Sequence, residues 1–197
     1  MRPDQEIIKR WIEPNSHVLD LGCGDGSLLA NLKETNNVKG IGLEIDEDKI
    51  QTCIERGINV IDQNLDDGLA NFQPDSFDTV LLAQTLQALS HPDRLIDEML
   101  RIGHRGIVTF PNFGNWKSRL YLASKGRMPV SKFMPHAWYN TPNIHFCTVR
   151  DFDALCEEKG IKVLERTVVD SQHEDSWAMR LFPNLFGEIA LYHIARK

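Results

Sequence analysis

The sequence predicts an α/β fold: a doubly wound, mostly parallel sheet with helices on both faces. Three observations lead to this expectation. Short apolar runs alternate along the chain with amphipathic stretches of helical period. The segment VLDLGCGDGSLL, residues 18–29, joins a buried strand to a helix through three glycines. Near the end, two strand-like segments follow each other with no helical pattern between them, which favours an antiparallel pair.

One domain is expected to cover residues 1–197, since the sequence contains no repeat, low-complexity tract or linker. No apolar run approaches the roughly 20 residues of a membrane span, and the first residues lack the apolar core of a signal peptide. Scattered cysteines without a CxxC pair favour reduced thiols in the cytoplasm over disulfides or a zinc site. The histidines show no metal-ligand spacing, so we expect no metal. The cysteines are Cys23, Cys53, Cys147 and Cys156.

Seven segments are predicted as strands, because their apolar runs are bounded by turn residues. They are His17–Leu21, Lys39–Leu43, Ile58–Ile61, Phe77–Leu82, Arg105–Phe110, about Lys162–Val169, and Glu188–Ile194. In sheets of this class ligands bind at the carboxyl edge, where the strand order reverses. The glycine segment follows the first strand and therefore lies at that edge.

Start and stop signals place the helices. Pro3 suits the first turn of a helix, and Asp46 is a plausible N-cap for another, which Gly57 ends. Ser90-His91-Pro92 begins a further helix, and Thr148-Val-Arg-Asp151 matches a capping box. The side chains expected to face the core from these helices are Ile7, Ile8, Trp11, Ile12, Ile50, Cys53, Ile54, Leu95, Ile96, Met99, Leu100, Phe152, Leu155 and Cys156.

The glycine turn after the first strand has the geometry of a ligand site. Gly22 can take a positive φ, Gly24 lets a ligand approach the backbone, and Gly26 allows tight packing where helix Ser27–Lys33 begins. A dinucleotide fingerprint would read G-x-G-x-x-G, but here the third glycine comes one residue early and position 27 is Ser. We therefore expect a cofactor smaller than a dinucleotide, held by acidic side chains as well as the turn.

Polar side chains at the ends of the first three strands supply such anchors. Asp20 ends the first strand, where a carboxylate suits a cationic ligand group, and Glu44 ends the second, where an acid accepts ribose hydroxyls. Asn64 follows the third strand and could pair with an adenine edge, with Leu65 against the ring. Taken alone, Glu44 also fits a solvated strand end, and a lone glycine turn also fits a structural loop. Asp46 and Asp78 are better explained as structural residues.

In this combination the sequence resembles the class I S-adenosylmethionine-dependent methyltransferases. VLDLGCGDG matches their first motif, GLEID their second-strand acid and SFDTVLLAQTLQAL their fourth strand. The resemblance covers nearly the whole chain and implies a Rossmann-like sheet of seven strands, the last antiparallel. It also implies that S-adenosylmethionine or S-adenosylhomocysteine binds over the glycine turn, with the methionine moiety near the turn. The implied contacts are Asp20, Gly22, Cys23, Gly24, Gly26, Glu44 (ribose), Ile45, Asn64 and Leu65 (adenine).

Four further stretches narrow the resemblance to the methionine biosynthesis protein MetW family. They are SHVLDLGCGDGSLL, LAQTLQAL, TFPNFGNWKSRLYL and PHAWYNTPNIHFCTVRDFDALCEEKGIKV. That family is associated with a homoserine O-acyltransferase, so the resemblance implies an accessory partner or activator at least as much as an enzyme. Because S-adenosylmethionine derives from the product of that pathway, we also hypothesise that the cofactor pocket senses supply and alters the activity of the partner.

A methyltransferase acting on a small molecule is the alternative. Transfer from a sulfonium needs mainly positioning, so the absence of an evident base decides nothing, and the catalytic residues stay unassigned. The [DN]-P-P-[YF] turn of some amino-group methyltransferases is replaced by Ala83-Gln84-Thr85-Leu86. His136 and His145 are better explained by hydrogen bonding than by catalysis, since no second group is spaced to orient them. A binding module without any cofactor is a third possibility.

Residues 99–150 contain no acid, although the chain carries a net charge of −6. Within this window, residues 111–146 form a long insert after the fifth strand that would overhang the ligand-binding edge as a lid or a docking surface. We favour an acidic protein partner or an anionic substrate over a plain solvated face, and the acidic chain argues against nucleic acid. The bases are Arg101, Arg105, Lys117, Arg119, Lys125, Arg127, Lys132 and Arg150, and the aromatic residues of the insert include Phe113, Trp116, Tyr121, Phe133, Trp138 and Tyr139.

Overall fold

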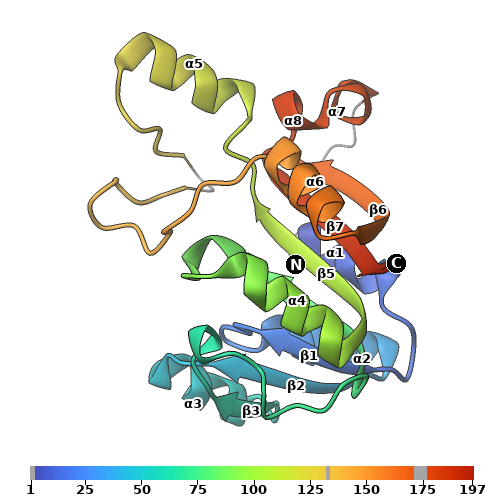
Figure 1. Cartoon of the computed structure of the whole chain (residues 1–197). Helices are drawn as coiled ribbons and strands as arrows, with labels where there is room; N and C mark the ends of the chain where they lie inside the picture. The colour runs from blue at the N-terminus through green and yellow to red at the C-terminus, as the bar shows by residue number, and fades with distance from the viewer. Residues whose placement is uncertain (1–2, 132–133, 171–176) are drawn as a thin grey trace.

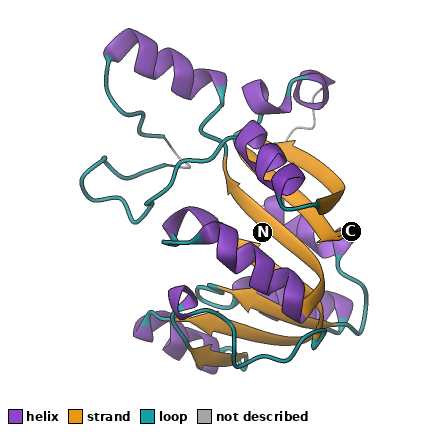
Figure 2. Cartoon of the chain, viewed as in Figure 1, coloured by secondary structure: helices purple, strands orange, loops and turns teal. Residues whose placement is uncertain are grey.

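A computed structural model describes residues 3–131, 134–170 and 177–197 (Figures 1 and 2). Seven strands form one sheet in the order β3-β2-β1-β4-β5-β7-β6. They are β1 His17–Leu21, β2 Lys39–Glu44, β3 Asn59–Asp62, β4 Phe77–Ala83, β5 Gly103–Pro111, β6 Ile161–Val169 and β7 Ile189–Arg196. Strands β1 to β5 run parallel, and β7 pairs antiparallel with both β5 and β6. The predicted fold class and the antiparallel terminal pair are confirmed.

Helices cover both faces of this sheet (Figure 2). The helices are α1 Pro3–Trp11, α2 Ser27–Asn36, α3 Glu47–Glu55, α4 Pro92–Ile102, α5 Trp116–Lys125, α6 Val149–Glu158, α7 Trp177–Leu181 and α8 Pro183–Phe186, with 3-10 turns η1 Leu65–Asp67 and η2 Leu86–Ala88. One hydrophobic core contains Ile8 of α1, Leu29 of α2 and Cys53 of α3. A second core on the other face contains Met99 of α4 and Phe152 of α6. The sheet is therefore buried between two helical layers.

The local signals for helix ends are confirmed. The Asp46 carboxylate accepts the N–H groups of residues 48 and 49 and so caps α3, and Gly57 follows that helix with φ of 68°. Thr148 and Asp151 form the expected capping box at the start of α6. The prediction for Ile54 is wrong, because its side chain is 58% exposed. Ile54 lies on the outer side of a short edge helix and has no layer of chain to pack against.

The structure differs from the prediction between β6 and β7, where α7 and α8 stand in place of an unstructured connection. These helices have five and four residues. Segments so short do not complete two turns, and a helical period is therefore not visible in their sequence. A third helix, α5, lies within the insert and was likewise not predicted from the sequence.

Helix α1 is fixed to the antiparallel half of the sheet. The Trp11 ring stacks on the His193 ring of β7, with 5.5 Å between the ring centroids. The indole Nε1 of Trp11 donates to the Glu165 carboxylate of β6 at 2.8 Å. The neighbouring end of β1 is held by Asp78, whose carboxylate accepts the His17 N–H at 2.7 Å. The structural explanation of Asp78 is thereby confirmed. Since α1 also contributes to a cleft at the carboxyl edge of the sheet, this docking helps to shape the candidate site described below.

Helix α5 projects away from the body at the end of β5 (Figure 1). Its base is anchored by Asn115, whose Oδ1 accepts the Lys117 N–H and whose Nδ2 donates to the carbonyls of Phe186 and Gly187. The rest of the helix is exposed, with Ser118 as its buried residue. Lys132 and Phe133 of the same insert lie outside the described residues. Within the described ranges, no helix combines the length and the apolar character that crossing a bilayer requires.

Candidate functional site

A cleft of about 1140 Å³ opens at the carboxyl edge of the sheet, around the point between β1 and β4 where the strand order reverses. Residues following β1, β2, β3 and β4 line it, and Asp4 and Gln5 of α1 close one side. Pro142 and Asn143 of the insert contribute to its wall. The volume exceeds the roughly 300–1,000 Å³ of common small-molecule pockets. The cleft is therefore large enough for a cofactor-sized ligand.

The glycine turn forms the floor of this cleft, and its three glycines serve different purposes. Gly22 has φ of 74°, and an added Cβ would lie 2.7 Å from Oγ1 of Thr85. Gly26 has φ of 72°, and its added Cβ would lie 2.9 Å from Sγ of Cys53. Gly24 has φ of 59°, and a Cβ there would meet no atom within 4 Å. Gly22 and Gly26 are thus required by packing, whereas Gly24 leaves the backbone accessible.

Glu44 links the end of β2 to this turn. Its Oε2 accepts the Gly24 N–H at 2.8 Å, and its Oε1 accepts the N–H groups of Ile45 at 2.9 Å and Asp46 at 3.1 Å. The side chain is buried, so a solvated strand end is the wrong explanation for it. A carboxylate offers about four lone-pair directions, and these three bonds leave one on Oε2. Glu44 can therefore accept one further donor without losing its hold on the turn.

The other predicted contacts also come together at the cleft: Asp20, Ile45, Asn64 and Leu65 line it. Asp20 is buried at the end of β1, while Ile45 is 59% exposed. Asn64 uses its Oδ1 to accept the N–H of Asp66 and so caps η1, while its Nδ2 donates to no other described residue. The amide thus keeps its two N–H groups for a ligand, and Leu65 and Ile45 supply apolar surface beside it.

Cys23 packs beneath the turn. Its Sγ lies 3.8 Å from Sγ of Cys53, which also contacts the Gly24 carbonyl at 3.2 Å. Burial raises the pKa of both thiols above the ordinary value, and the carboxylate of Asp20 raises that of Cys23 further. Both thiols are therefore protonated at neutral pH and behave as small apolar groups. Cys23 thus fills space under the loop, and it also lines the cleft.

Sequence reasoning missed a hydrogen-bonded connection between the cleft wall and the insert. Gln84, which directly follows β4 and has φ of 62°, donates its N–H to the Thr109 carbonyl. Its own carbonyl accepts Nε2 of Gln87 at 2.7 Å. The Gln87 carbonyl in turn accepts the N–H groups of Ile144 at 2.8 Å and His145 at 3.0 Å. Nothing in the local sequence marks this contact, because glutamine is not a residue typical of the left-handed region.

The two histidines of the insert do not line the cleft. His145 is exposed, and its Nε2 lies 3.4 Å from the Ser90 carbonyl, in agreement with a hydrogen-bonding role. His136 is exposed and makes no hydrogen bond to another described residue. Neither is placed to act on a ligand in the cleft.

The basic window is partly neutralised by acids from outside it. The pairs are Arg101 with Glu98, Arg105 with Glu13 and Lys117 with Glu188, each at 2.6–2.7 Å. Arg119, Lys125, Arg127 and Arg150 form no ion pair with another described residue. Three of these four lie on α5 or directly after it, so the remaining positive charge is concentrated on the projecting part of the insert.

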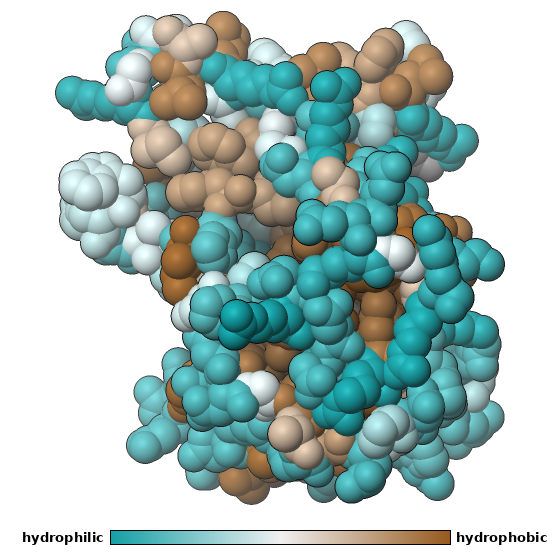
Figure 3. All heavy atoms as spheres, in the orientation of Figure 1, coloured by the Kyte–Doolittle hydropathy of each residue, from teal (hydrophilic) through white to brown (hydrophobic). Residues whose placement is uncertain are grey.

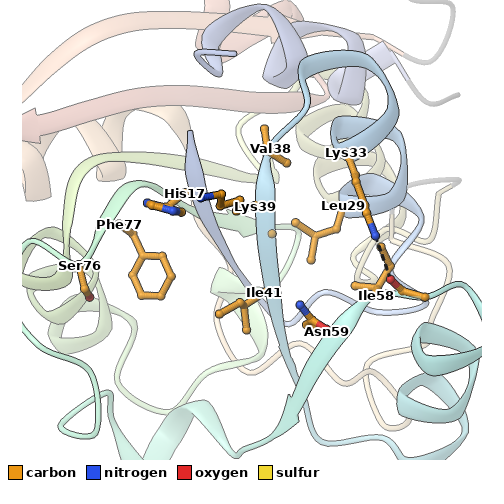
Figure 4. A pocket seen from close by; sticks show the side chains of 12 residues that line it. His17, Leu29, Lys33, Val38, Lys39, Ile41, Ile58, Asn59, Ser76 and Phe77 are labelled. Carbon is orange, nitrogen blue, oxygen red and sulfur yellow. Dashed lines mark hydrogen bonds between the residues drawn. The ribbon is translucent and has the colours of Figure 1, made fainter. Parts of the chain in front are cut away.

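A second cavity of about 600 Å³ lies at the opposite edge of the sheet, at the amino ends of β1 to β4 (Figure 4). His17, Lys39 and Phe77 belong to its wall, and Lys33 Nζ donates to the Gly57 carbonyl at 3.3 Å. Ser76, in the connection from β3 to β4, also lines it. This edge is not the one at which doubly wound sheets bind ligands, so the larger cleft is the candidate site.

Among the described residues, no three His, Cys, Asp or Glu side chains lie together in the arrangement of a metal site.

Comparison with known proteins adds the family context. Residues 2–194 match the family model for methionine biosynthesis protein MetW. The "Bifunctional methionine biosynthesis protein MetXA/MetW" of Rhodopirellula baltica is 34% identical over 98% of this chain, which spans only 33% of that relative. Among solved structures, methyltransferases dependent on S-adenosylmethionine from Thermotoga maritima and Mesorhizobium loti share the fold. The Thermotoga maritima protein is 20% identical with a TM-score of 0.66, and the match covers 98% of this chain and 88% of the Thermotoga chain. The Mesorhizobium loti protein is 15% identical with a TM-score of 0.70, and the match covers 99% of this chain and 98% of the Mesorhizobium chain.

Proposed function

The chain belongs to the family of methionine biosynthesis protein MetW, and on that premise we propose that it binds and activates a homoserine O-acyltransferase as an accessory partner. The relative from Rhodopirellula baltica carries this proposal, because one polypeptide there combines a MetW part with a MetXA part. We take the MetXA part to be the acyltransferase. Joining two units in one chain keeps them at a high effective concentration, which favours units that act in contact. We also propose that the protein acts in the cytoplasm, because that compartment keeps cysteine thiols reduced.

We further propose that the larger cleft binds S-adenosylmethionine or S-adenosylhomocysteine. The Gly24 backbone lies open to the cleft, and Glu44 keeps one acceptor direction for a ribose hydroxyl. The Asn64 amide and the Leu65 side chain would border the adenine, while Asp20, which also lines the cleft, would lie near the amino group. The donor set therefore fits the cofactor. When bound, S-adenosylmethionine would supply an activated methyl group.

The acylation rate of a homoserine O-acyltransferase from the same organism tests the proposal. The rate is measured for the acyltransferase alone and with this protein, each with and without S-adenosylmethionine. A large rise on adding the protein is expected, while an equal amount of a denatured sample should have no effect. Unchanged rates in all combinations, at concentrations where both proteins are folded, would exclude the accessory role.

A methyltransferase acting on a small molecule is the second candidate, and the size of the cleft favours it. Beyond the glycine turn the wall continues to Gln84, Asn143 and Ile189, which leaves room beside a bound cofactor. In this case the chain would hold an acceptor in line with the methyl group and exclude water. Transfer of labelled methyl groups to candidate acceptors is the test, and Glu44→Ala should abolish it. Labelling without acyltransferase activation would favour this second function.

A further inference from the structure

Helix α5 exposes apolar side chains on more than one side. Trp116 and Leu120 are four positions apart and therefore share a side, with 43% and 58% of their surfaces exposed. Leu122 is also exposed and lies about 200° around the helix from Leu120. A one-sided apolar stripe would suit a flat surface, whereas apolar side chains on opposite sides of a helix suit a groove that contacts both sides. A ten-residue helix is also only marginally stable by itself.

The loop after α5 adds aromatic side chains to the same projecting region. Trp138 and Tyr139 are each 74% exposed and contact each other edge to face, with centroids 5.8 Å apart. Phe146 packs on Phe113 at 4.9 Å and is still 45% exposed. In the space-filling view, hydrophobic surface lies beneath α5 and again over α7 and α8 (Figure 3). Aromatic residues and arginine are the types that dominate binding energy at protein interfaces.

Charge indicates the character of the surface that would meet this region. Arg119, Lys125 and Arg127 lack an acidic partner among the described residues, and the sequence from 99 to 150 contains no acid. A partner with carboxylates around an apolar groove would complement both features. A protein groove is favoured over a lipid surface, because the apolar side chains of α5 do not lie on one side.

We propose that α5 inserts into an acid-rimmed apolar groove of the homoserine O-acyltransferase, with the 137–146 loop packing at its edge. The identity of the occupant rests on the proposed function. The base of α5 is already fixed through Asn115 and the Lys117–Glu188 pair at 2.6 Å, so the helix is oriented before it binds. Insertion would bury the apolar sides that the chain itself leaves open and would stabilise a helix that has little support of its own.

A matched pair of variants tests this docking surface. Leu120→Asp changes the proposed docking helix α5. Ile54→Asp is the control, because it changes α3, which packs beside β3 at the other end of the sheet from α5. Both residues lie on helices, and both side chains are 58% exposed. Affinity for the purified acyltransferase is measured by titration calorimetry, after urea unfolding has shown that both variants are folded. Leu120→Asp should weaken binding at least tenfold, and Ile54→Asp should bind like the wild type. A second α5 variant, Leu122→Asp, should also weaken binding, because an enclosed helix is contacted on both sides.

The failures of the two proposals are distinguishable. Wild-type affinity in both α5 variants would overturn the docking surface while leaving the accessory role intact. No binding by the wild type would overturn the accessory role and the assignment of the occupant together. Two other outcomes would also overturn the proposal. If the wild type binds anionic phospholipid vesicles and Leu120→Asp does not, the occupant is a membrane. If the wild type forms a dimer and Leu120→Asp does not, the occupant is a second copy of this chain.

Discussion

The carboxylate of Glu44 accepts the N–H of Gly24 at 2.8 Å and thereby ties the end of β2 to the open position of the glycine turn. Two strands that end at the same edge are thus joined across the floor of the cleft. The backbone of Gly24 lies exposed to the cleft beside the one acceptor direction that Glu44 retains. Cofactor binding and the shape of the turn therefore depend on the same side chain.

From this arrangement we expect Glu44→Gln to weaken S-adenosylhomocysteine binding by roughly 10- to 100-fold. The variant replaces a charged acceptor by a neutral one, and hydrogen bonds to charged groups contribute about 1.5–3 kcal/mol. Titration calorimetry measures the affinity directly. Glu47→Gln is the control, since Glu47 is exposed on α3 and does not line the cleft. Equal affinities for both variants would show that Glu44 serves the turn and not the ligand.

The parts of the fold that could be predicted are those determined by neighbouring residues. Asp46 caps α3 and Thr148 caps α6 as expected, because a cap depends on three or four consecutive positions. The doubly wound, mostly parallel class of the sheet follows from the alternation of elements and from the rules of crossover connections. The gathering of Asp20 and Glu44 at one cleft follows in turn, because the carboxyl ends of parallel strands share one edge.

What could not be predicted depends on contacts between distant segments. The bond from Ile144 of the insert to the Gln87 carbonyl joins residues more than fifty positions apart in the sequence. Two of the three ion pairs that neutralise part of the basic window likewise use distant acids, Glu13 and Glu188. Helix α5 lacks a one-sided apolar pattern, and α7 is too short to show one.

We expect Gly22→Ala to destabilise the fold more than Gly24→Ala. Both glycines have positive φ, where a residue with a Cβ costs about 1–2 kcal/mol, but only at position 22 does the Cβ overlap Thr85, at 2.7 Å. Urea unfolding measures the difference. The double variant Gly22→Ala/Thr85→Ala should be less destabilised than the sum of the losses in unfolding free energy of the two single variants. Strict additivity would mean that the loop moves away from Thr85 without cost.

The free energy of unfolding should contain a pH-dependent contribution from His193. The ring is buried under Trp11, and burial, followed by the charge of Arg105, lowers the pKa below the ordinary value of 6.5. The unfolded chain therefore binds more protons than the folded one just below pH 6.5, so stability falls as the pH is lowered through that value. His193→Phe keeps a ring under Trp11 and removes this contribution.

The comparison of wild type and His193→Phe by urea unfolding from pH 8 to pH 5 isolates the effect. The stability of the wild type relative to the variant should decrease as the pH falls. His136→Gln changes an exposed histidine and should leave the wild-type profile unchanged. Parallel profiles for wild type and His193→Phe would show that another group causes any acid sensitivity.

Cofactor occupancy should change the affinity for the acyltransferase, because segment 137–146 lines the cleft and also belongs to the proposed docking surface. Asn143 lines the cleft, the next two residues are bonded to Gln87 in η2, and Trp138 and Tyr139 lie on the exposed surface. A ligand that fixes Asn143 would therefore bias the position of the aromatic pair. Coupling of this kind amounts to about 5- to 150-fold in affinity, and it acts equally in both directions. The partner should accordingly change the affinity for S-adenosylhomocysteine by the same factor.

Two titrations measure this coupling: the acyltransferase into this protein with and without saturating S-adenosylhomocysteine, and the ligand into this protein with and without the acyltransferase. The two factors should agree, since binding free energies around a closed cycle must sum to zero. Glu44→Ala should still bind the acyltransferase but lose the response to ligand, because the docking surface on α5 lies outside the cleft. Identical affinities with and without ligand would show that the cleft and the projecting helix act independently, and the sensing hypothesis would then be abandoned.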